Sequence, residues 1–287
     1  MYAGTSPSET PAGGGRGGSP DLPSYVRADG RLRMRLAARP RGTEPVELSE
    51  SGGYRIRFPR VGPCEAVMIN TGGGMTGGDR LTVDVALDAG AQAVATTQSA
   101  EKLYRSTGAS TRVDVRLTLA ERARLAWLPQ ESILFSGARL DRRFDIDMDP
   151  SATLTLCEAM IFGRVAMGET LGDGLIRDRW RVRRGGRLLF AEAIRLDGTL
   201  AGGLAHPTVA GDARAVATIL HVAPDAEARL EEARAALASA TSDCGASAWS
   251  SMLVARFAAP SPSSLRKDVA RFLETFLAAP LPRVWQC

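Results

Sequence analysis

A glycine-rich loop is the part of this chain whose residue types most directly suggest chemistry. Residues 72–79 contain five glycines and end in Asp79, and they lie between the apolar segment 66–69 and an alternating apolar and polar segment, 81–87. Glycine permits backbone angles that other residues avoid and lets another group approach the main chain closely. Apart from the Thr76 hydroxyl, no side chain before Asp79 in this loop could act as an acid, a base or a nucleophile. Binding here therefore falls to backbone amides or to Asp79, which argues against an ordinary enzyme site.

Two familiar uses of a glycine-rich loop do not fit this sequence. A phosphate-binding loop ends in Gly-Lys-Ser or Gly-Lys-Thr and leads into a helix, because the lysine and the helix N-terminus neutralise the phosphate. Here Asp79 follows the glycines, and the period-two alternation of residues 81–87 also argues against a dinucleotide-binding turn. A tight loop between strands is the structural alternative, and a nucleotide-binding module stays open as a functional one.

Polar side chains also recur at the ends of strands in a fourfold repeat. Each copy has two alternating segments joined by a turn, and the copies follow at intervals of about 30 to 36 residues. The copies cover residues 83–98, 113–131, 144–158 and 180–192. Their second segments end at Gln98, at Gln130 with Glu131, at Glu158 and at Glu192. Stacked copies would bury a continuous core and would place these polar ends on one edge or in one passage, unless they are simply strand ends that meet water.

The elements that must position these residues are mainly β. We predict a layered, repeat-like β-sheet body, either β-helix-like or sandwich-like, with two α-helices near the C-terminus. Apolar residues at helical spacing place the helices at 225–240 and 264–279, with one more strand over 252–257 between them. Residues 1–24 are rich in Gly, Pro and Ser and lack the apolar core of a secretory signal, so we predict a disordered tail before a single domain, 25–287.

Composition argues against several classes of protein. The 36 basic and 32 acidic residues give a pI of about 9.1, but the arginines are scattered and only 6% of residues are aromatic, unlike a nucleic-acid binder. No segment approaches the roughly eighteen apolar residues of a membrane span. We therefore expect a soluble, cytoplasmic protein that binds neither nucleic acid nor membrane. The cysteines and histidines are too dispersed to predict a tight transition-metal site, and the roles of His206, His221 and Cys287 stay open.

With these residues in view, the chain resembles the urease accessory protein D family, also written UreD or UreH, from about residue 26 to residue 285. The motifs that carry the resemblance are Gly73-Gly74 with Gly77-Gly78-Asp79, then residues 100–106 with Lys102, Tyr104 and Arg105, then Trp127 to Glu131 with Gln130, Phe135 and Gly137, then Gly163-Arg164, Gly168-Glu169, and the segments 245–247 and 281–285. The chain departs from the family in having Asn70 to Gly72 where two prolines are common, and in having few histidines.

The resemblance implies a mostly β, non-enzymatic factor for urease maturation. Members bind urease apoprotein and recruit accessory proteins F and G, the latter a GTPase, so that nickel reaches the dinuclear urease site along a polar route. It implies no tightly bound cofactor, only Ni²⁺ in transit. Scattered carboxylates suit such a route, because several histidines or thiolates would hold nickel too firmly. We predict that Asp79, Glu158, Glu169 and Glu192 contribute, with Asp79 and Glu192 foremost.

Other roles stay open for the same residues. Asp79 could pair with Arg80 or cap the glycine loop, and Glu169 could pair with Arg164. The cluster of Lys102, Tyr104 and Arg105 fits a structural role and a partner-docking role equally. The alternative function is a β-solenoid enzyme that cleaves glycans with paired carboxylates, although the chain has few aromatic residues to stack on sugars.

Overall fold

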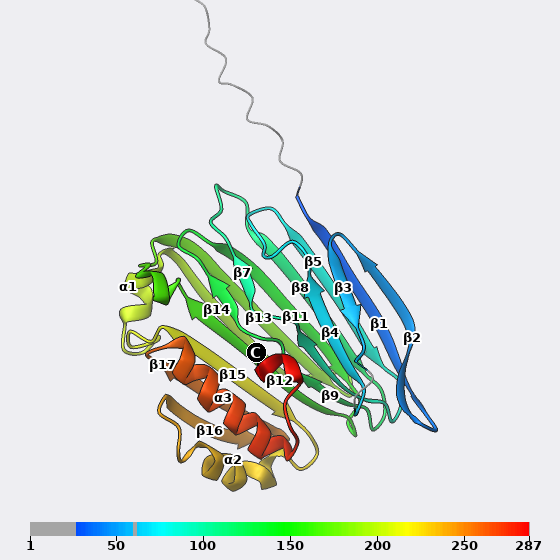
Figure 1. Ribbon diagram of the computed structural model, residues 1–287. Helices are drawn as coiled ribbons and strands as arrows, with labels where there is room; N and C mark the ends of the chain where they lie inside the picture. The colour runs from blue at the N-terminus through cyan, green and yellow to red at the C-terminus, as the bar shows by residue number, and fades with distance from the viewer. Residues whose placement is uncertain (1–26, 60–61, 287) are drawn as a thin grey trace, which may run out of the picture.

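Two packed β-sheets form the body of the protein in a computed structural model that describes residues 27–59 and 62–286 (Figure 1). Sheet A has seven strands in the order β14-β13-β11-β8-β5-β1-β2. These are β1 (Asp29–Arg39), β2 (Gly42–Ser51), β5 (Arg80–Leu87), β8 (Thr111–Leu119), β11 (Arg139–Met148), β13 (Asp173–Arg184) and β14 (Arg187–Thr199). The predicted tail, residues 1–24, and Cys287 lie outside the described residues.

Sheet B has ten strands, eight of them in the order β16-β17-β15-β12-β9-β6-β4-β3. The short strand β10 extends it by pairing with β12 and with β7. Its strands are β3 (Tyr54–Arg57), β4 (Glu65–Asn70), β6 (Gln92–Thr97), β7 (Glu101–Leu103), β9 (Arg124–Trp127), β10 (Ser132–Leu134), β12 (Thr153–Phe162), β15 (Ala215–Val222), β16 (Asp243–Trp249) and β17 (Met252–Ala259). The mainly β, layered fold predicted from the sequence is confirmed.

Three of the four predicted copies step from sheet A to sheet B and stack in parallel. β5 leads to β6, β8 to β9 and β11 to β12, and neighbouring copies pair in parallel within each sheet. The connecting turns span four residues, as at 88–91 and 120–123, and this length lets the chain cross to the other sheet. The stacking is solenoid-like, as the repeat predicted.

The fourth copy differs, because β13 and β14 form an antiparallel hairpin within sheet A. Only Gly185 and Gly186 connect them, with φ of +57° and +77°. A two-residue turn with positive φ at both positions closes a hairpin and cannot reach the facing sheet. The prediction that all four polar strand ends share one edge is therefore wrong for Glu192, which lies on β14 at the edge of sheet A.

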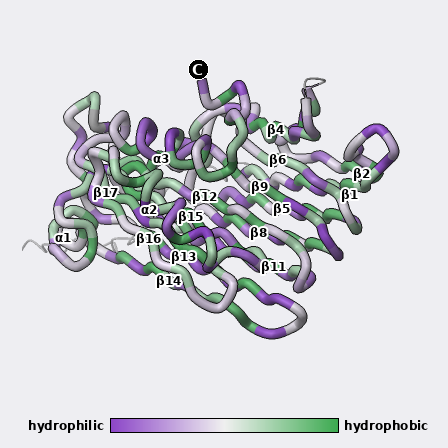
Figure 2. The backbone as a smooth tube through the Cα atoms, turned by 90° about the horizontal axis from the view of Figure 1, so that it is seen from below, coloured by the Kyte–Doolittle hydropathy of each residue, from purple (hydrophilic) through white to green (hydrophobic). Residues whose placement is uncertain are grey.

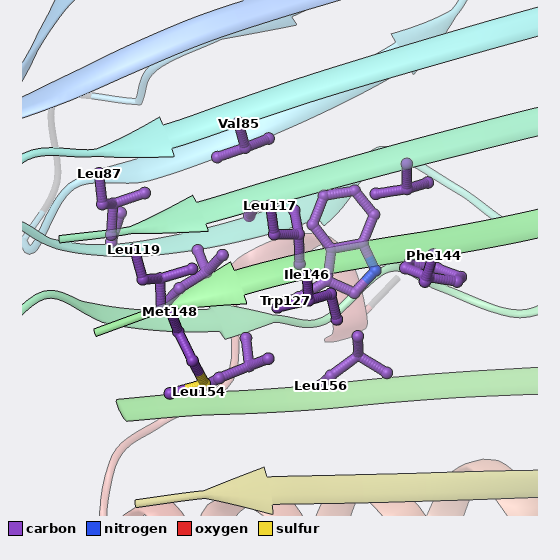
Figure 3. Close-up of a cluster of buried hydrophobic side chains, with 14 of the residues drawn as sticks. Val85, Leu87, Leu117, Leu119, Trp127, Phe144, Ile146, Met148, Leu154 and Leu156 are labelled. Carbon is purple, nitrogen blue, oxygen red and sulfur yellow. The ribbon is translucent and has the colours of Figure 1, made fainter. Parts of the chain in front are cut away.

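The core lies between the sheets and follows from the alternation along each strand. Figure 2 shows hydrophilic and hydrophobic positions alternating along β5, β8 and β11. Val85, Leu117 and Ile146 stand side by side in the parallel register of sheet A and are buried. Trp127 from sheet B meets Phe144 from sheet A edge to face, with ring centroids 6.1 Å apart (Figure 3).

Both predicted C-terminal helices are present and pack with the end of sheet B formed by β15, β16 and β17 (Figure 1). The first comprises a 3₁₀ turn, η2 (Ala226–Arg229), and α2 (Leu230–Leu237), and the second is α3 (Pro262–Leu277). Ser261 caps α3, since its Oγ accepts a hydrogen bond from the amide of Ser264 at 3.1 Å. A further short helix, α1 (Leu200–Ala205), was not predicted. None of the described helices is both long and apolar enough to span a membrane.

The histidine His221 is a packing residue beneath α3. Its ring is buried edge to face against Phe276, and Nδ1 hydrogen-bonds to the hydroxyl of Thr155 at 2.9 Å. Burial lowers the pKa of His221 to about 4, with a smaller contribution from Arg229, so the ring is neutral at physiological pH.

Candidate functional site

The loops that carry the sequence motifs lie together at one end of the sandwich. They precede β5, β8, β11 and β13, whose first residues are neighbours in the parallel register of sheet A. Backbone hydrogen bonds join them directly: the amide of Gly78 donates to Ser110 at 3.2 Å, that of Ser106 to Gly137 at 2.9 Å, and that of Gly163 to Leu134 at 2.8 Å. Motifs far apart in the sequence therefore form one continuous surface.

The glycine loop, residues 72–79, needs its glycines for close approach. A Cβ on Gly74 would lie 2.5 Å from the Tyr104 ring and 2.8 Å from the carbonyl oxygen of Lys102, and its φ is +148°. A Cβ on Gly77 would overlap the Ser106 side chain and lie 2.5 Å from the carbonyl oxygen of Ala109. Gly73 and Gly78 adopt φ of +74° and +93°, which side chains disfavour. The loop is pressed against the neighbouring segment 102–109.

Replacing Gly77 with alanine is expected to destabilise the protein by about 1–3 kcal/mol, because the new methyl group overlaps Ser106 in a tightly packed loop. Chemical denaturation of both proteins measures this difference. Gly108→Ala is the matched control, since a Cβ there meets nothing within 4 Å. Equal stability of the two variants would show that the loop has room to relax.

Asp79 ties this loop to the start of β1. Its Oδ1 accepts a hydrogen bond from the amide of Ala28 at 3.0 Å, and its Oδ2 accepts one from the amide of Thr76 at 2.8 Å. The residue is 7% exposed. Of the two structural roles that the sequence left open for Asp79, capping the glycine loop is the arrangement that the structure contains.

The cluster of Lys102, Tyr104 and Arg105 lies beside the glycine loop and is exposed. The hydroxyl of Tyr104 donates to the carbonyl oxygen of Gly73 at 3.1 Å, and its ring packs edge to face on Phe135, 5.0 Å between centroids. Among the described residues, neither Lys102 nor Arg105 has an acidic partner within salt-bridge distance. An aromatic residue 37% exposed between two cations that lack acidic partners has the character of an interface anchor.

Glu169 organises the neighbouring loop. It forms a two-point ion pair with Arg164, with Arg164 Nη2 at 3.0 Å from Oε1 and Nε at 3.2 Å from Oε2. The amide of Ser136 donates to the same carboxylate at 3.3 Å. The side-chain hydrogen bond from Arg164 is the largest of the contacts that lower the pKa of Glu169. Gly163, with φ of +82°, turns the chain from β12 into this loop.

A cavity of about 160 Å³ runs from the glycine loop into the space between the sheets. Gly73, Gly74 and Lys102 line its loop end. Core residues such as Val83 and Phe144 line its interior. Its charged and amide-bearing lining residues are Asn70, Gln98, Glu101, Lys102, Gln130, Arg142 and Glu158, and the hydroxyl-bearing residues Tyr54, Thr97, Ser99 and Ser132 also line it. Of the polar strand ends that the repeat would place together, Gln98, Gln130 and Glu158 share this cavity wall, whereas Glu131 does not line it.

Glu158 belongs to a buried charge cluster within this wall. The indole Nε1 of Trp127 donates to its Oε1 at 2.8 Å, and Nη1 of Arg142 donates to its Oε2. Arg142 also binds Asp178 at two points, with Nε at 3.1 Å and Nη2 at 2.6 Å from the carboxylate oxygens. Burial raises the pKa of Glu158, against the lowering effect of Arg142. Burial alone would lower the pKa of Arg142, but Asp178 and Glu158 outweigh it and raise that pKa.

Glu101, at the start of β7, is an acidic wall residue that the sequence did not indicate as a ligand. Asn70 Nδ2 donates to its Oε1 at 2.9 Å and to the hydroxyl oxygen of Tyr54 at 3.2 Å. Burial raises the pKa of Glu101 to about 7. An acid that titrates near neutral pH inside a cavity is a candidate functional group. No spacing pattern marks it, because its hydrogen-bond partner Asn70 lies 31 positions away.

Gln130 and Glu131 fasten the C-terminal segment to the sheet. Gln130 Nε2 donates to the carbonyl oxygens of Gln98 and Val284, each at 2.9 Å. Both carboxylate oxygens of Glu131 lie 3.0 Å from Nη1 of Arg266 on α3. Trp285 completes the attachment, since its indole nitrogen donates to the carbonyl oxygen of Leu128 at 3.0 Å. The motifs at 127–131 and 281–285 are therefore one structural unit.

Glu192 stands apart from the cavity. It pairs with Arg256 of β17, with Nη2 at 2.5 Å and Nη1 at 3.2 Å from its carboxylate oxygens. This ion pair links the edge of sheet A to sheet B. Of the four acids predicted for a metal route, only Glu158 lines the cavity, while Asp79, Glu169 and Glu192 have partners elsewhere. Within the described part of the chain, no three Asp, Glu, His or Cys side chains are placed to hold a metal ion.

The family model described as UreD urease accessory protein matches residues 28–286, which include every loop and strand of this site. The chain belongs to the UreD urease accessory protein family. It is 50% identical over 265 residues to the urease accessory protein UreD of Azorhizobium caulinodans, covering 92% of this chain and 98% of that protein. It is 48% identical to that of a Methylobacterium species over 276 residues, covering 93% and 98%. The resemblance stated from the motifs is confirmed, and the chain spans nearly the whole length of these UreD relatives.

Proposed function

We propose that this UreD protein is a non-enzymatic scaffold for urease maturation, which binds urease apoprotein and joins it to accessory proteins F and G. Family membership over residues 28–286 supports the maturation role. The exposed Tyr104, between Lys102 and Arg105 on the motif-bearing loop end, supports a docking role for that surface. The protein itself needs no tightly bound cofactor in this role.

Co-purification tests the scaffold role. The tagged chain is co-expressed with the urease structural subunits and accessory protein F, and we expect both to be retained on it. The double variant Tyr104→Ala with Arg105→Ala is expected to weaken the binding of one partner at least tenfold. A tenfold change corresponds to about 1.4 kcal/mol of binding free energy, and the loss of one interface anchor typically costs more than that. The control is Arg116→Ala, which changes an exposed arginine paired with Asp84 on the outer face of sheet A. A soluble chain that retains neither partner would overturn the scaffold role and favour a carboxylate enzyme.

We further propose that nickel, the cargo, passes through the inter-sheet cavity and that Glu158 is its principal carboxylate there. The observation that carries this proposal is the row of amides and carboxylates along the cavity wall: Asn70, Gln98, Glu101, Gln130 and Glu158. Oxygen ligands bind nickel more weakly than several imidazoles or thiolates would, so an ion can enter and leave. Asp79, Glu169 and Glu192 stay in the proposal as carboxylates outside the cavity, since none of them lines it.

Charge-removing substitutions test the route. Glu158→Gln keeps an oxygen to accept from Trp127 and leaves Arg142 balanced by Asp178, so the fold should persist. We expect it to lower the nickel content of co-expressed urease severalfold without loss of the complex. Glu47→Gln, on the exposed strand β2, is the control. Normal nickel loading in Glu158→Gln and in Asp79→Ala with Glu192→Ala, with the complex intact, would refute the route.

A further inference from the structure

An arginine lies in the cavity wall beside Glu158. Arg142 and Glu158 both line the cavity, and both are almost fully buried, with 5% and 7% of their surface exposed. Arg142 and Asp178 are neighbours across the β11–β13 ladder of sheet A, and Glu158 faces them from sheet B. The guanidinium therefore lies between two carboxylates, Asp178 beside it and Glu158 opposite.

With Arg142 in this position, each oxygen of Glu158 already accepts one hydrogen bond, and one of these donors carries a positive charge. Its Oε1 accepts from Trp127 and its Oε2 accepts from Arg142. A cation in the cavity would also meet the positive guanidinium at short range, where the poorly screened interior strengthens repulsion. The carboxylate proposed as the principal ligand of the route is thus occupied by a charge of the same sign as the cargo.

The contacts of Arg142 are unequal in a way that permits exchange. Asp178 holds the guanidinium through two parallel hydrogen bonds from Nε and Nη2, whereas Glu158 contacts only Nη1. A two-point arginine–carboxylate pair has fixed geometry and is the stronger of the two attachments. Arg142 can therefore give up Glu158 while Asp178, on the same sheet, retains it. Because Asp178 is 2% exposed, the released guanidinium stays paired within the protein.

We propose that Arg142 is an internal counter-ion that controls whether Glu158 can bind a divalent cation, so that the cavity is open to nickel only when Arg142 leaves Glu158. This inference rests on the proposed nickel route, and it deepens that route by naming its gate. In this scheme a divalent ion takes the place of the guanidinium at Glu158. Because the ion carries two positive charges and the guanidinium one, the ion can compete for the same carboxylate. Arg142 is a positioning residue in this scheme, since it does not touch the metal.

Nickel titration of the purified full-length chain, followed by calorimetry at pH 7.5, tests the gate. Arg142→Met removes the charge and keeps most of the side-chain volume. We expect it to bind one Ni²⁺ at least about 100-fold more tightly than the wild type, because a unit positive charge no longer stands beside the ion. Arg142→Met with Glu158→Gln is expected to lose that site. Arg179→Met, which changes an exposed arginine paired with Asp141, should bind like the wild type.

Two results would overturn the proposal. One is wild-type affinity in a folded Arg142→Met protein. The other is tight binding that survives Glu158→Gln. If Arg142→Met is unfolded without metal, nickel should restore its cooperative melting and should fail to do so in the double variant. Failure of nickel to restore it would also overturn the proposal, because a cation could then not replace the guanidinium. The titration uses the chain alone, so its outcome is independent of whether the chain retains urease and accessory protein F.

Discussion

Replacing Arg142 with methionine is expected to lower the free energy of unfolding of the metal-free protein by about 3–5 kcal/mol at pH 8. The substitution leaves Glu158 and Asp178 buried without their shared counter-ion. Denaturant unfolding measures the change. The loss should shrink as the pH falls, because burial raises the pKa of Glu158 and its carboxylate destabilises the fold only where it is ionised.

A double-mutant cycle separates charge imbalance from lost packing. Arg142→Met with Glu158→Gln is expected to be more stable than Arg142→Met alone, since one uncompensated charge is gone. Arg179→Met, which removes an exposed ion pair, should lower the free energy of unfolding by at most about 1 kcal/mol. If Arg142→Met and the double variant were equally unstable, the cost would come from packing, and the cluster would not be held by charge.

The alternation of inward and outward positions along the strands indicates that Arg142 and Asp178, as well as Glu158, are buried. Arg142 stands in the alternation Leu140, Arg142, Phe144, Ile146, whose other members are buried. Asp178 likewise follows Ile176 and precedes Trp180 at inward positions of β13. A charged residue at an inward position of a strand must find a partner. The alternation thus marks three buried charges, but only the sheet register shows that they meet.

Turn length decided where the sequence predictions succeeded and where they failed. The alternation correctly identified the strands of all four copies. It could not say which copies cross between sheets, since both strands of a hairpin also alternate. The two-glycine turn at 185–186 carries that information, because it fixes a hairpin. The length and composition of this turn therefore distinguish Glu192 from Glu158 at the level of the sequence itself.

The positions of Asp79 and Glu101 depend on contacts that no local pattern records. Asp79 receives one of its hydrogen bonds from Ala28, 51 residues away. Glu101 owes its environment to Asn70 and Tyr54 across sheet B. Local chemistry identifies such residues as polar loop or strand residues. Whether an acid caps a turn or faces a cavity is set by the stacking of the copies.

Glu101→Gln is expected to stabilise the protein by an amount that grows between pH 4.5 and 7 and is complete above pH 7, and to leave stability unchanged below pH 4.5. The pKa of Glu101 is about 7 in the folded protein, against 4.5 for an unperturbed group. Below pH 4.5 the carboxyl is protonated in both states and has no effect on stability. Between pH 4.5 and 7 the unfolded state ionises while the folded state keeps its proton, so the cost grows with pH and levels off above 7 at about 3.5 kcal/mol, at about 1.4 kcal/mol per pKa unit. Glutamine mimics the protonated form and avoids this cost.

Unfolding free energies of the wild type and Glu101→Gln at pH 5, 7 and 8.5 test the prediction. The difference in unfolding free energy between the two proteins should increase with rising pH. Glutamine can still accept the hydrogen bond from Asn70, and it carries no charge. Glu47→Gln, an exposed change on β2, should show no such gap. A constant difference at all three pH values would mean that Glu101 titrates normally. A gap that widens with pH would show that the protein keeps an ionisable acid in the cavity at the expense of stability, as expected of a residue retained for function.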